Sequence, residues 1–208
     1  MKKILISLMA IALVIGLVGA GAFAYFSDTE TSTDNTFTAG TLNLKVNTND
    51  GSNTVVFTES NKAPGDSGSG TWTLVNNGSL AGYVDLESIS VANAENYDAA
   101  TNEAEAADDV NTSIDGELGA NLDVVLFWDD GAGGGIADNR IQDGTEATIY
   151  SGVLDSIAGS YGADYPLAAS GTTYISMTWS IATTVDNAIQ GDSATLDMTV
   201  ELAQTAGQ

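Results

Sequence analysis

The chain has 208 residues and a formal net charge of −23, with 28 acidic side chains against five lysines and arginines. Such an excess of carboxylates repels nucleic acid and anionic lipid, which both need cationic contacts, and makes divalent cations the natural counterions. The absence of histidine and cysteine excludes disulfides, Ser-His-Asp and Cys-His catalytic arrangements and the HExxH zinc helix.

The first 24 residues have the layout of a secretory signal peptide. Lys2 and Lys3 precede an uncharged run, Ile4 to Val18, and small residues then lead to Ala22-Phe23-Ala24. We expect signal peptidase to cleave after Ala24, with cleavage after Ala22 as the alternative. Cleavage predicts a secreted, extracellular or cell-surface protein that has no membrane contact afterwards.

Two other interpretations of the same run stay open at this point. Its length approaches that of a membrane span, so it could be a retained anchor. An archaeal pilin-type signal would be cut before its apolar core and would keep that core. The small residues from Gly19 to Ala22 favour cleavage, because a peptidase needs them and a membrane span does not.

The next segment, residues 25–36, begins with Tyr25 and Phe26 and continues as a polar, threonine-rich tract. Its threonines favour an extended backbone, but its side chains do not alternate between apolar and polar. The residues alone leave a flexible leader and a strand that pairs with another chain equally open.

Residues 37–208 alternate apolar and polar side chains over many short stretches, the pattern of half-buried strands. We expect strands over residues 41–46, 54–58, 71–75, 83–91, 122–128, 145–150, 175–181 and 194–202. Residues 151–170 are expected to be a long connection. Residues 93–119 are expected to be a solvated acidic insertion with a short helix near 103–110. Frequent Gly, Asn and Asp between the strands indicate an all-β antiparallel sandwich in a single domain.

A Gly/Asp-rich loop follows the expected strand at 122–128 and is the best candidate for a metal site. Calcium takes six to eight oxygen ligands, which closely spaced Asp and Asn on a flexible loop can supply. The candidate calcium ligands are Asp129, Asp130, Asp138, Asn139 and Asp143. The spacing does not match an EF-hand, so an ordinary acidic hairpin loop is the alternative.

Two further patterns concern modification and catalysis. Asn77-Gly78-Ser79 and Asn111-Thr112-Ser113 fit the N-glycosylation pattern. Carboxylate pairs do not indicate a catalytic site here, because pairs arise by chance among so many acids. We therefore predict that the chain is not an enzyme.

Three segments together resemble the TasA/camelysin family. The first runs from Ala24-Tyr25-Phe26-Ser27-Asp28 through Asn35 to Leu44, and the second from Pro64-Gly65-Asp66 to Leu74-Val75-Asn76-Asn77-Gly78-Ser79-Leu80. The third is Trp179 followed by Asn187-Ala188-Ile189-Gln190-Gly191-Asp192-Ser193. They occur in the family's order and span the mature chain.

The resemblance implies a jelly-roll sandwich that forms biofilm-matrix fibres or bundling pili as a head-to-tail homopolymer. It implies donor-strand complementation, in which the mature N-terminus of one subunit fills a groove in the next. The donor strand would then contain Tyr25, Phe26, Ser27, Asp28 and Thr29, with Phe37 at its far end. Two alternatives stay open: a secreted metalloprotease of the camelysin type, which the missing histidine argues against, and a monomeric cell-surface adhesin module.

Overall fold

The computed structural model describes residues 40–47, 49–50, 54–95, 116–185, 189 and 191–207, together with Lys3, Ile4, Ile6 and Met9. The chain divides into two compact units, Met1–Ala39 and Gly40–Gln208. The predicted cleavage sites and the predicted donor residues from Tyr25 to Phe37 lie outside the described residues. Within the described residues, no helix has the length and apolar character needed to cross a membrane.

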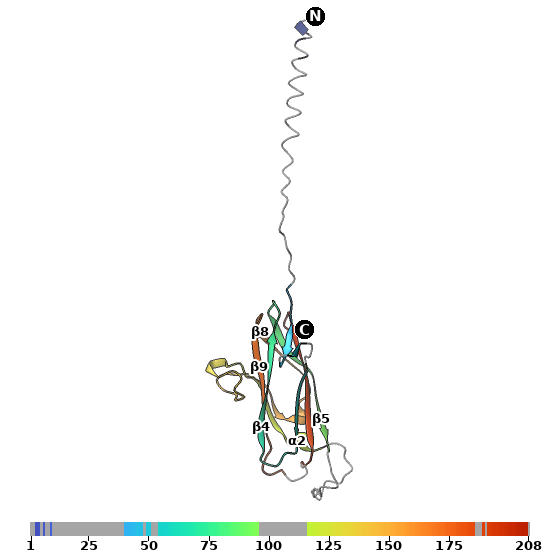
Figure 1. Ribbon diagram of the computed structural model, residues 1–208, viewed down its shortest axis with the longest axis vertical. Helices are drawn as coiled ribbons and strands as arrows, with labels where there is room; N and C mark the ends of the chain where they lie inside the picture. The colour runs from blue at the N-terminus through green and yellow to red at the C-terminus, as the bar shows by residue number, and fades with distance from the viewer. Residues whose placement is uncertain are drawn as a thin grey trace. The chain divides into compact units, whose positions relative to one another are not determined.

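The second unit is a β-sandwich of two antiparallel sheets, which confirms the predicted fold class (Figure 1). Sheet A has six strands in the order β2-β1-β4-β9-β6-β7, and sheet B has four in the order β3-β10-β5-β8. Sheet A contains β1 (Leu44–Val46), β2 (Asn49–Asp50), β4 (Ser67–Asn76), β6 (Asp123–Trp128), β7 (Thr148–Val153) and β9 (Thr172–Ser180). Sheet B contains β3 (Thr54–Ser60), β5 (Gly82–Ala94), β8 (Gly159–Leu167) and β10 (Ser193–Ala203). The short helices are α2 (Leu118–Asn121), η1 (Ala132–Gly134) and η2 (Leu154–Ser156).

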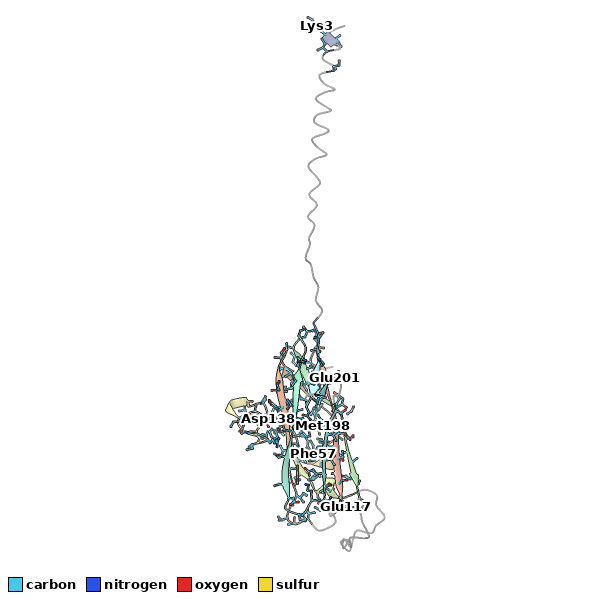
Figure 2. All side chains as sticks on the ribbon, viewed as in Figure 1. Lys3, Phe57, Glu117, Asp138, Met198 and Glu201 are labelled. Carbon is cyan, nitrogen blue, oxygen red and sulfur yellow. The ribbon has the colours of Figure 1, made fainter. Side chains whose placement is uncertain are left out.

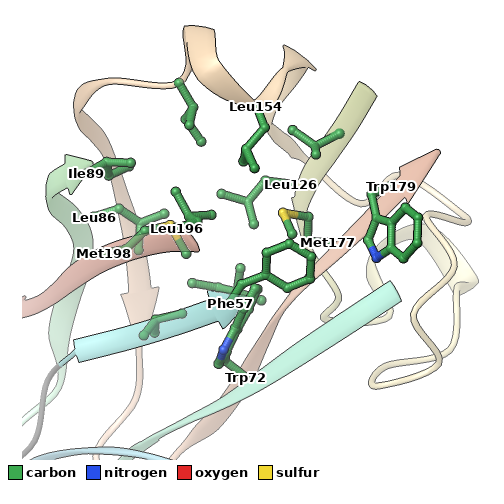
Figure 3. Close-up of a cluster of buried hydrophobic side chains, with 14 of the residues drawn as sticks. Phe57, Trp72, Leu86, Ile89, Leu126, Leu154, Met177, Trp179, Leu196 and Met198 are labelled. Atoms are coloured by element: carbon green, nitrogen blue, oxygen red, sulfur yellow. The ribbon is translucent and has the colours of Figure 1, made fainter. Parts of the chain in front are cut away.

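The core lies between the two sheets and is formed by every second residue of the central strands. In β10, Leu196 and Met198 are fully buried, and in β9 Met177 is also fully buried. Figure 3 shows these side chains meeting Leu126 and Leu86 in one cluster. The period-2 alternation in the sequence therefore predicted the buried face of these strands correctly.

One predicted connection is wrong, because residues 151–170 contain an edge strand. Strand β8 pairs with β5, and the pairing register shifts twice along its length. Irregular pairing interrupts the strict alternation of buried and exposed side chains by which a strand is identified in sequence. The strand also contains Pro166, and proline occurs mostly in edge strands because it has no backbone N–H to donate. A neighbouring difference is that β7 begins at Thr148 instead of Thr145.

The ends of the predicted acidic insertion belong to the sandwich. Asn93 and Ala94 are the last two residues of β5, and Leu118 at the start of α2 is fully buried. Residues 96–115, including the helix predicted near 103–110, lie outside the described residues.

The first residues of the sandwich are tied to the turn after β4. The backbone N–H of Asn77 donates to the carbonyl of Asn43 at 2.6 Å, and that of Leu80 donates to the carbonyl of Thr41 at 3.1 Å. A Cβ on Gly78 would collide with the Thr41 carbonyl, so glycine is required where the two segments cross. These contacts fix the position at which the chain enters the sandwich from its N-terminal side.

Candidate functional site

Three carboxylates from separate parts of the chain converge at one end of the sandwich. Glu95 follows β5, Glu117 precedes α2 and Asp192 precedes β10, and each places a carboxylate oxygen within 4.8 Å of the other two. We call this group the carboxylate cluster. Asp192 is fully buried, whereas the two glutamates are half-buried.

Backbone groups hold the Asp192 side chain in place. Its Oδ2 atom accepts hydrogen bonds from the backbone N–H groups of Glu117 at 2.6 Å and Leu118 at 3.1 Å. Gly116 lies so close that a Cβ would come within 2.9 Å of the Asp192 Cγ atom and 2.8 Å of the Ala94 carbonyl oxygen. A larger residue at position 116 would therefore push into the cluster.

The chemistry of the donor set decides which ions the carboxylate cluster suits. Its side chains offer only oxygen atoms, and the chain contains no histidine or cysteine to add nitrogen or sulfur. Nearby, Asn93 has a buried Oδ1 atom with no hydrogen-bond donor among the described residues. Oxygen ligands are typical of Ca²⁺, Mg²⁺ and Mn²⁺, whereas zinc sites usually contain histidine or cysteine.

The residues predicted to bind calcium lie on the loop between β6 and β7, residues 129–147, which we call the acidic loop. Asp129 is fully buried, and its Oδ2 atom accepts from the Arg140 N–H at 2.8 Å and the Ser176 hydroxyl at 2.7 Å. Its Oδ1 atom accepts from the Asn139 N–H at 3.3 Å. This carboxylate therefore links residues 139 and 140 of the loop to Ser176 on β9.

The other predicted ligands also contact the loop or its neighbours. Asp143 accepts from the Ile136 N–H at 3.0 Å and from the Asn139 amide at 2.9 Å. Asp130 accepts from the Ala132 N–H at 2.9 Å, while Asp138 accepts from the Thr71 hydroxyl at 3.3 Å. Within the described residues, the loop does not bring three carboxylates as close together as the carboxylate cluster does. Calcium binding by this loop stays a prediction.

The acidic loop also depends on a residue that the sequence did not single out. Glu146 is 6 % exposed and accepts hydrogen bonds from the backbone N–H groups of Gly131 at 2.8 Å and Asp143 at 3.0 Å. The sequence pattern predicts that Glu146 belongs to a strand over residues 145–150, whereas β7 begins at Thr148 and Glu146 lies in the loop. No local pattern distinguishes a strand glutamate from one that closes a loop.

Asp130 extends the network to an aromatic group next to the acidic loop. The Tyr165 hydroxyl donates to Asp130 Oδ2 at 2.6 Å, and the Tyr165 ring stacks on Trp128 with centroids 4.0 Å apart. Burial raises the pKa of Tyr165 above its usual 10.0, and the bond to the Asp130 carboxylate raises it further. Both effects favour the neutral phenol, which keeps the stack and the hydrogen bond together.

One side of β4 is open along most of its length. The closed side of β4 pairs with β9 from Ser67 to Val75, whereas on the open side β1 covers only Leu74 to Asn76. Asn47 extends the covered part by one residue, because its N–H donates to the Thr73 carbonyl at 2.9 Å and its Oδ1 accepts from the Thr73 N–H at 3.0 Å. From residue 67 to 72, no strand in the described part of the chain pairs with this side.

The backbone groups on the open side follow from the antiparallel ladder. Successive residues direct their N–H and C=O groups to opposite sides of a strand. Because those of Thr73 face Asn47, those of Thr71, Ser69 and Ser67 also face away from β9. They form a template for one more strand.

Strand β3, at the edge of sheet B, lies across the sandwich from this open side. The Trp72 indole N–H donates to the Val56 carbonyl at 3.4 Å, and the Trp72 ring meets Phe57 edge to face with centroids 6.5 Å apart. The core-facing positions of the open stretch are Gly68 and Gly70, and the Trp179 ring fills the space over Gly68. Buried aromatic rings therefore close the core beside the open side of β4.

Two predicted sites have no structural test. The donor residues Tyr25, Phe26, Ser27, Asp28, Thr29 and Phe37 lie outside the described residues. Asn77 is exposed, as a glycan acceptor must be, and Asn111 lies outside the described residues.

Comparison with known proteins identifies the family to which the sequence is similar. A family model described as camelysin metallo-endopeptidase matches residues 1–208. This match confirms the resemblance to the TasA/camelysin family that the sequence segments indicated. No curated protein matches the chain.

The same match corrects one prediction. The chain was expected not to be an enzyme, but the matched family is described as a family of metallo-endopeptidases. The expectation rested on the chance occurrence of carboxylate pairs and on the absence of histidine and cysteine, which excludes only catalytic sites built from those residues. Carboxylates can hold a metal ion without either.

Proposed function

The chain belongs to the camelysin metallo-endopeptidase family, and from this premise we propose that it is an extracellular structural subunit whose copies assemble into a filament. Each copy donates its mature N-terminal segment, residues 25–36, to the open side of β4 in the next copy. The filament would be of the biofilm-matrix or pilus type. Family membership supports the extracellular location, and the open side of β4 is the observation that carries the assembly mechanism.

The geometry of the open side supports a donated strand. Ser67, Ser69 and Thr71 offer up to six backbone groups to an incoming strand, which is the mode of recognition called β-augmentation. The threonines at positions 29, 31, 33 and 36 favour the extended backbone that such a strand needs. One chain would then supply both the donor and the acceptor, as a homopolymer requires.

Hydrogen bonds alone do not account for stable docking. Six of them contribute roughly 3–9 kcal/mol. Fixing the backbone of the roughly six donor residues that lie opposite residues 67–72 costs roughly 6–12 kcal/mol. Burial of an aromatic side chain adds about 1.5–3 kcal/mol, so Tyr25 and Phe26 are the residues that shift the balance toward docking.

A matched pair of substitutions on β4 tests the proposal. Ser69→Pro removes a backbone N–H on the open side without touching the bonds to β9, and Ser69→Thr keeps that N–H. We expect the purified mature Ser69→Pro protein to fold and stay monomeric, while Ser69→Thr forms filaments visible by negative-stain microscopy. Circular dichroism and thermal midpoints check that both variants are folded.

Deleting residues 25–36 tests the donor side in the same assay. The truncated protein should not polymerise alone, and a synthetic peptide of residues 25–36 should bind it. Filaments from the truncated protein, or from folded Ser69→Pro, would refute the mechanism.

Metal-dependent peptide hydrolysis is a second candidate function, which the family description favours. The carboxylate cluster is the described group that fits a metal ion, with Asp192 held by two N–H groups and Glu95 and Glu117 beside it. The set fits an oxygen-preferring divalent cation and does not fit a histidine-ligated zinc ion. When bound, such an ion would polarise a carbonyl group through its oxygen and lower the pKa of a water molecule bound to it.

Casein cleavage by the repurified mature protein tests this candidate. We expect a chelator to abolish cleavage, and Asp192→Asn to reduce it while keeping an oxygen acceptor for the α2 N–H groups. Asp123→Asn, an exposed acid at the start of β6, is the matched control and should cleave normally. Chelator-resistant cleavage, or equal cleavage by Asp192→Asn, would refute a role for the carboxylate cluster.

A further inference from the structure

The indole N–H of Trp179 is a buried hydrogen-bond donor that has no acceptor among the described residues. The Trp179 side chain is buried and lies at one end of the core cluster (Figure 3). A buried donor that makes no hydrogen bond costs free energy, so native proteins contain few of them. Such a donor is satisfied when a further chain brings an acceptor to it.

The Trp179 ring extends from its own strand toward the open side of β4. Trp179 on β9 pairs with Gly68 on β4, and a Cβ on Gly68 would come within 2.7 Å of the ring and 3.0 Å of its Nε1 atom. The N–H edge of the ring therefore lies over β4, one strand nearer to the open side than the backbone that carries it. Further along β4, Trp72 contacts Phe57, which lies near the middle of the sandwich (Figure 2).

A strand added to the open side would bring a side chain to this N–H. Directly opposed residues of neighbouring strands have Cβ atoms about 4.5–5.5 Å apart. A core-facing residue opposite Gly68 would therefore hold an oxygen on its Cβ within hydrogen-bonding reach of the Trp179 Nε1 atom. The Lys62 ammonium group, 5.3 Å from the Trp179 ring centroid, has no acceptor atom and cannot satisfy the N–H.

The sequence of the proposed donor segment has two different faces. Successive side chains of an extended strand point to opposite faces. The even positions carry all three carboxylates of the segment, at Asp28, Glu30 and Asp34, and Phe26 shares this charged face. The odd positions form an uncharged face of hydroxyl, amide and aromatic groups: Tyr25, Ser27, Thr29, Thr31, Thr33, Asn35 and Phe37.

The two faces differ in what their burial costs. A carboxylate opposite Gly68 would lose its hydration, and Lys62, the cation at this position, is already paired with Glu59 at 2.7 Å. Burying an unpaired charge costs far more than burying a hydroxyl that makes a hydrogen bond. With the charged face outward, the carboxylates stay in water, where dissolved ions screen their repulsion from the acidic surface of the next copy.

We propose that the segment donated by a second copy docks with its uncharged face toward the core, and that a threonine hydroxyl on this face accepts the hydrogen bond from the Trp179 indole N–H. The inference rests on the proposed function, because it names the buried face and the polar anchor of the strand donated to β4. Trp179 would thereby select the donor, since an apolar side chain opposite Gly68 would leave the N–H unpaired. Every residue from 27 to 36 has a side-chain oxygen, as this selection requires.

A matched pair of charges in the full mature chain tests which face is buried. Thr31→Glu adds a carboxylate to the uncharged face, whereas Ser32→Glu adds one to the charged face. The critical concentration for assembly is the protein concentration that remains in solution after filaments are sedimented. We expect Thr31→Glu to raise it about tenfold or more, and Ser32→Glu to raise it less than about twofold. Equal effects, or a larger effect of Ser32→Glu, would overturn the proposal.

A double-substitution cycle tests the bond to Trp179. Trp179→Phe removes the indole N–H, while Thr29→Val, Thr31→Val and Thr33→Val each remove a hydroxyl and keep the β-branched shape. We expect one of the three valine substitutions to raise the critical concentration about tenfold in the wild type and to have no effect in the Trp179→Phe protein. Additive effects for all three would contradict the anchoring bond.

A second measurement covers the case in which Trp179→Phe does not fold. The proton resonance of the Trp179 indole N–H is compared by NMR between wild-type filaments and the monomeric Ser69→Pro protein. Hydrogen bonding predicts a downfield shift in the filaments, and an unchanged resonance would contradict the anchoring bond.

The outcomes separate this inference from the proposed function. If deleting residues 25–36 abolishes assembly but Thr31→Glu and Ser32→Glu have equal effects, the strand is donated in another orientation and only the inference fails. If the deletion leaves assembly intact, the donor-strand mechanism itself fails.

Discussion

Replacing Asp129 with alanine tests whether the acidic loop is organised by its own carboxylates. The fully buried Asp129 side chain accepts hydrogen bonds from the Arg140 N–H at 2.8 Å, the Ser176 hydroxyl at 2.7 Å and the Asn139 N–H at 3.3 Å. Alanine would leave all three donors without this acceptor. The loop would then lose its attachment to β9.

The expected size of the effect follows from these contacts. A hydrogen bond to a charged group contributes about 1.5–3 kcal/mol. Ser176 is fully buried, so its hydroxyl cannot turn to water, whereas the two loop N–H groups can regain some hydration. We therefore expect Asp129→Ala to lower the free energy of unfolding by about 3–5 kcal/mol. For a domain of this size, the melting temperature should fall by roughly 6–20 °C.

Urea unfolding followed by tryptophan fluorescence measures this change, with a chelator and with calcium. Asp138→Asn is the matched control, because the Asp138 side chain is exposed and accepts one long bond from Thr71 at 3.3 Å, and asparagine tolerates the positive φ of 58° at this position. It should cost less than about 1 kcal/mol. An Asp129→Ala loss below about 1 kcal/mol in chelator would refute the reasoning, because that value is smaller than a single bond to a charged group. A loss that appears only with calcium would mean that an ion, and not the hydrogen bonds, organises the loop.

Three further predictions concern other parts of the sandwich. Gly78→Ala should lower stability by about 2–3 kcal/mol in urea unfolding, because its methyl group would collide with the Thr41 carbonyl, and an unchanged midpoint would contradict the packing described here. If the carboxylate cluster binds calcium, the ion at 100 times its dissociation constant should raise the melting temperature by about 5–10 °C in the wild type and not in Asp192→Asn. The raised pKa of Tyr165 means that its contribution to stability is complete below the unfolded value of 10.0 and is lost as the pH rises through the folded pKa. Melting temperatures should therefore fall less steeply above pH 10 in Tyr165→Phe than in the wild type, and equal slopes would count against the buried phenol.

Local sequence patterns identified most strands because half-buried strands carry their own signal. In β9 and β10, every second side chain is buried, and the apolar residues occur with the same period. The pattern failed at β8, where the shifts in register against β5 interrupt the alternation. It also placed the start of β7 too early, because Glu146 closes the acidic loop and is not part of the strand.

The candidate sites were less accessible to sequence reasoning. Glu95, Glu117 and Asp192 are far apart in the chain, and in an acidic protein none of them is conspicuous. The acidic loop was conspicuous, but its spacing could not show that Asp129 and Asp143 accept hydrogen bonds from the loop backbone. The same spacing of aspartates fits carboxylates that bind an ion and carboxylates that accept hydrogen bonds from their own loop.

The sequence by itself determined the sandwich class, the buried face of its regular strands and the segments that mark its family, because each of these depends on residues that are near neighbours in the chain. Only the tertiary structure decided the order of the strands, the open side of β4 and the meeting of three carboxylates beside α2. Those features depend on which distant strands become neighbours. That choice is made by the packing of the whole core, and no local window of residues contains it.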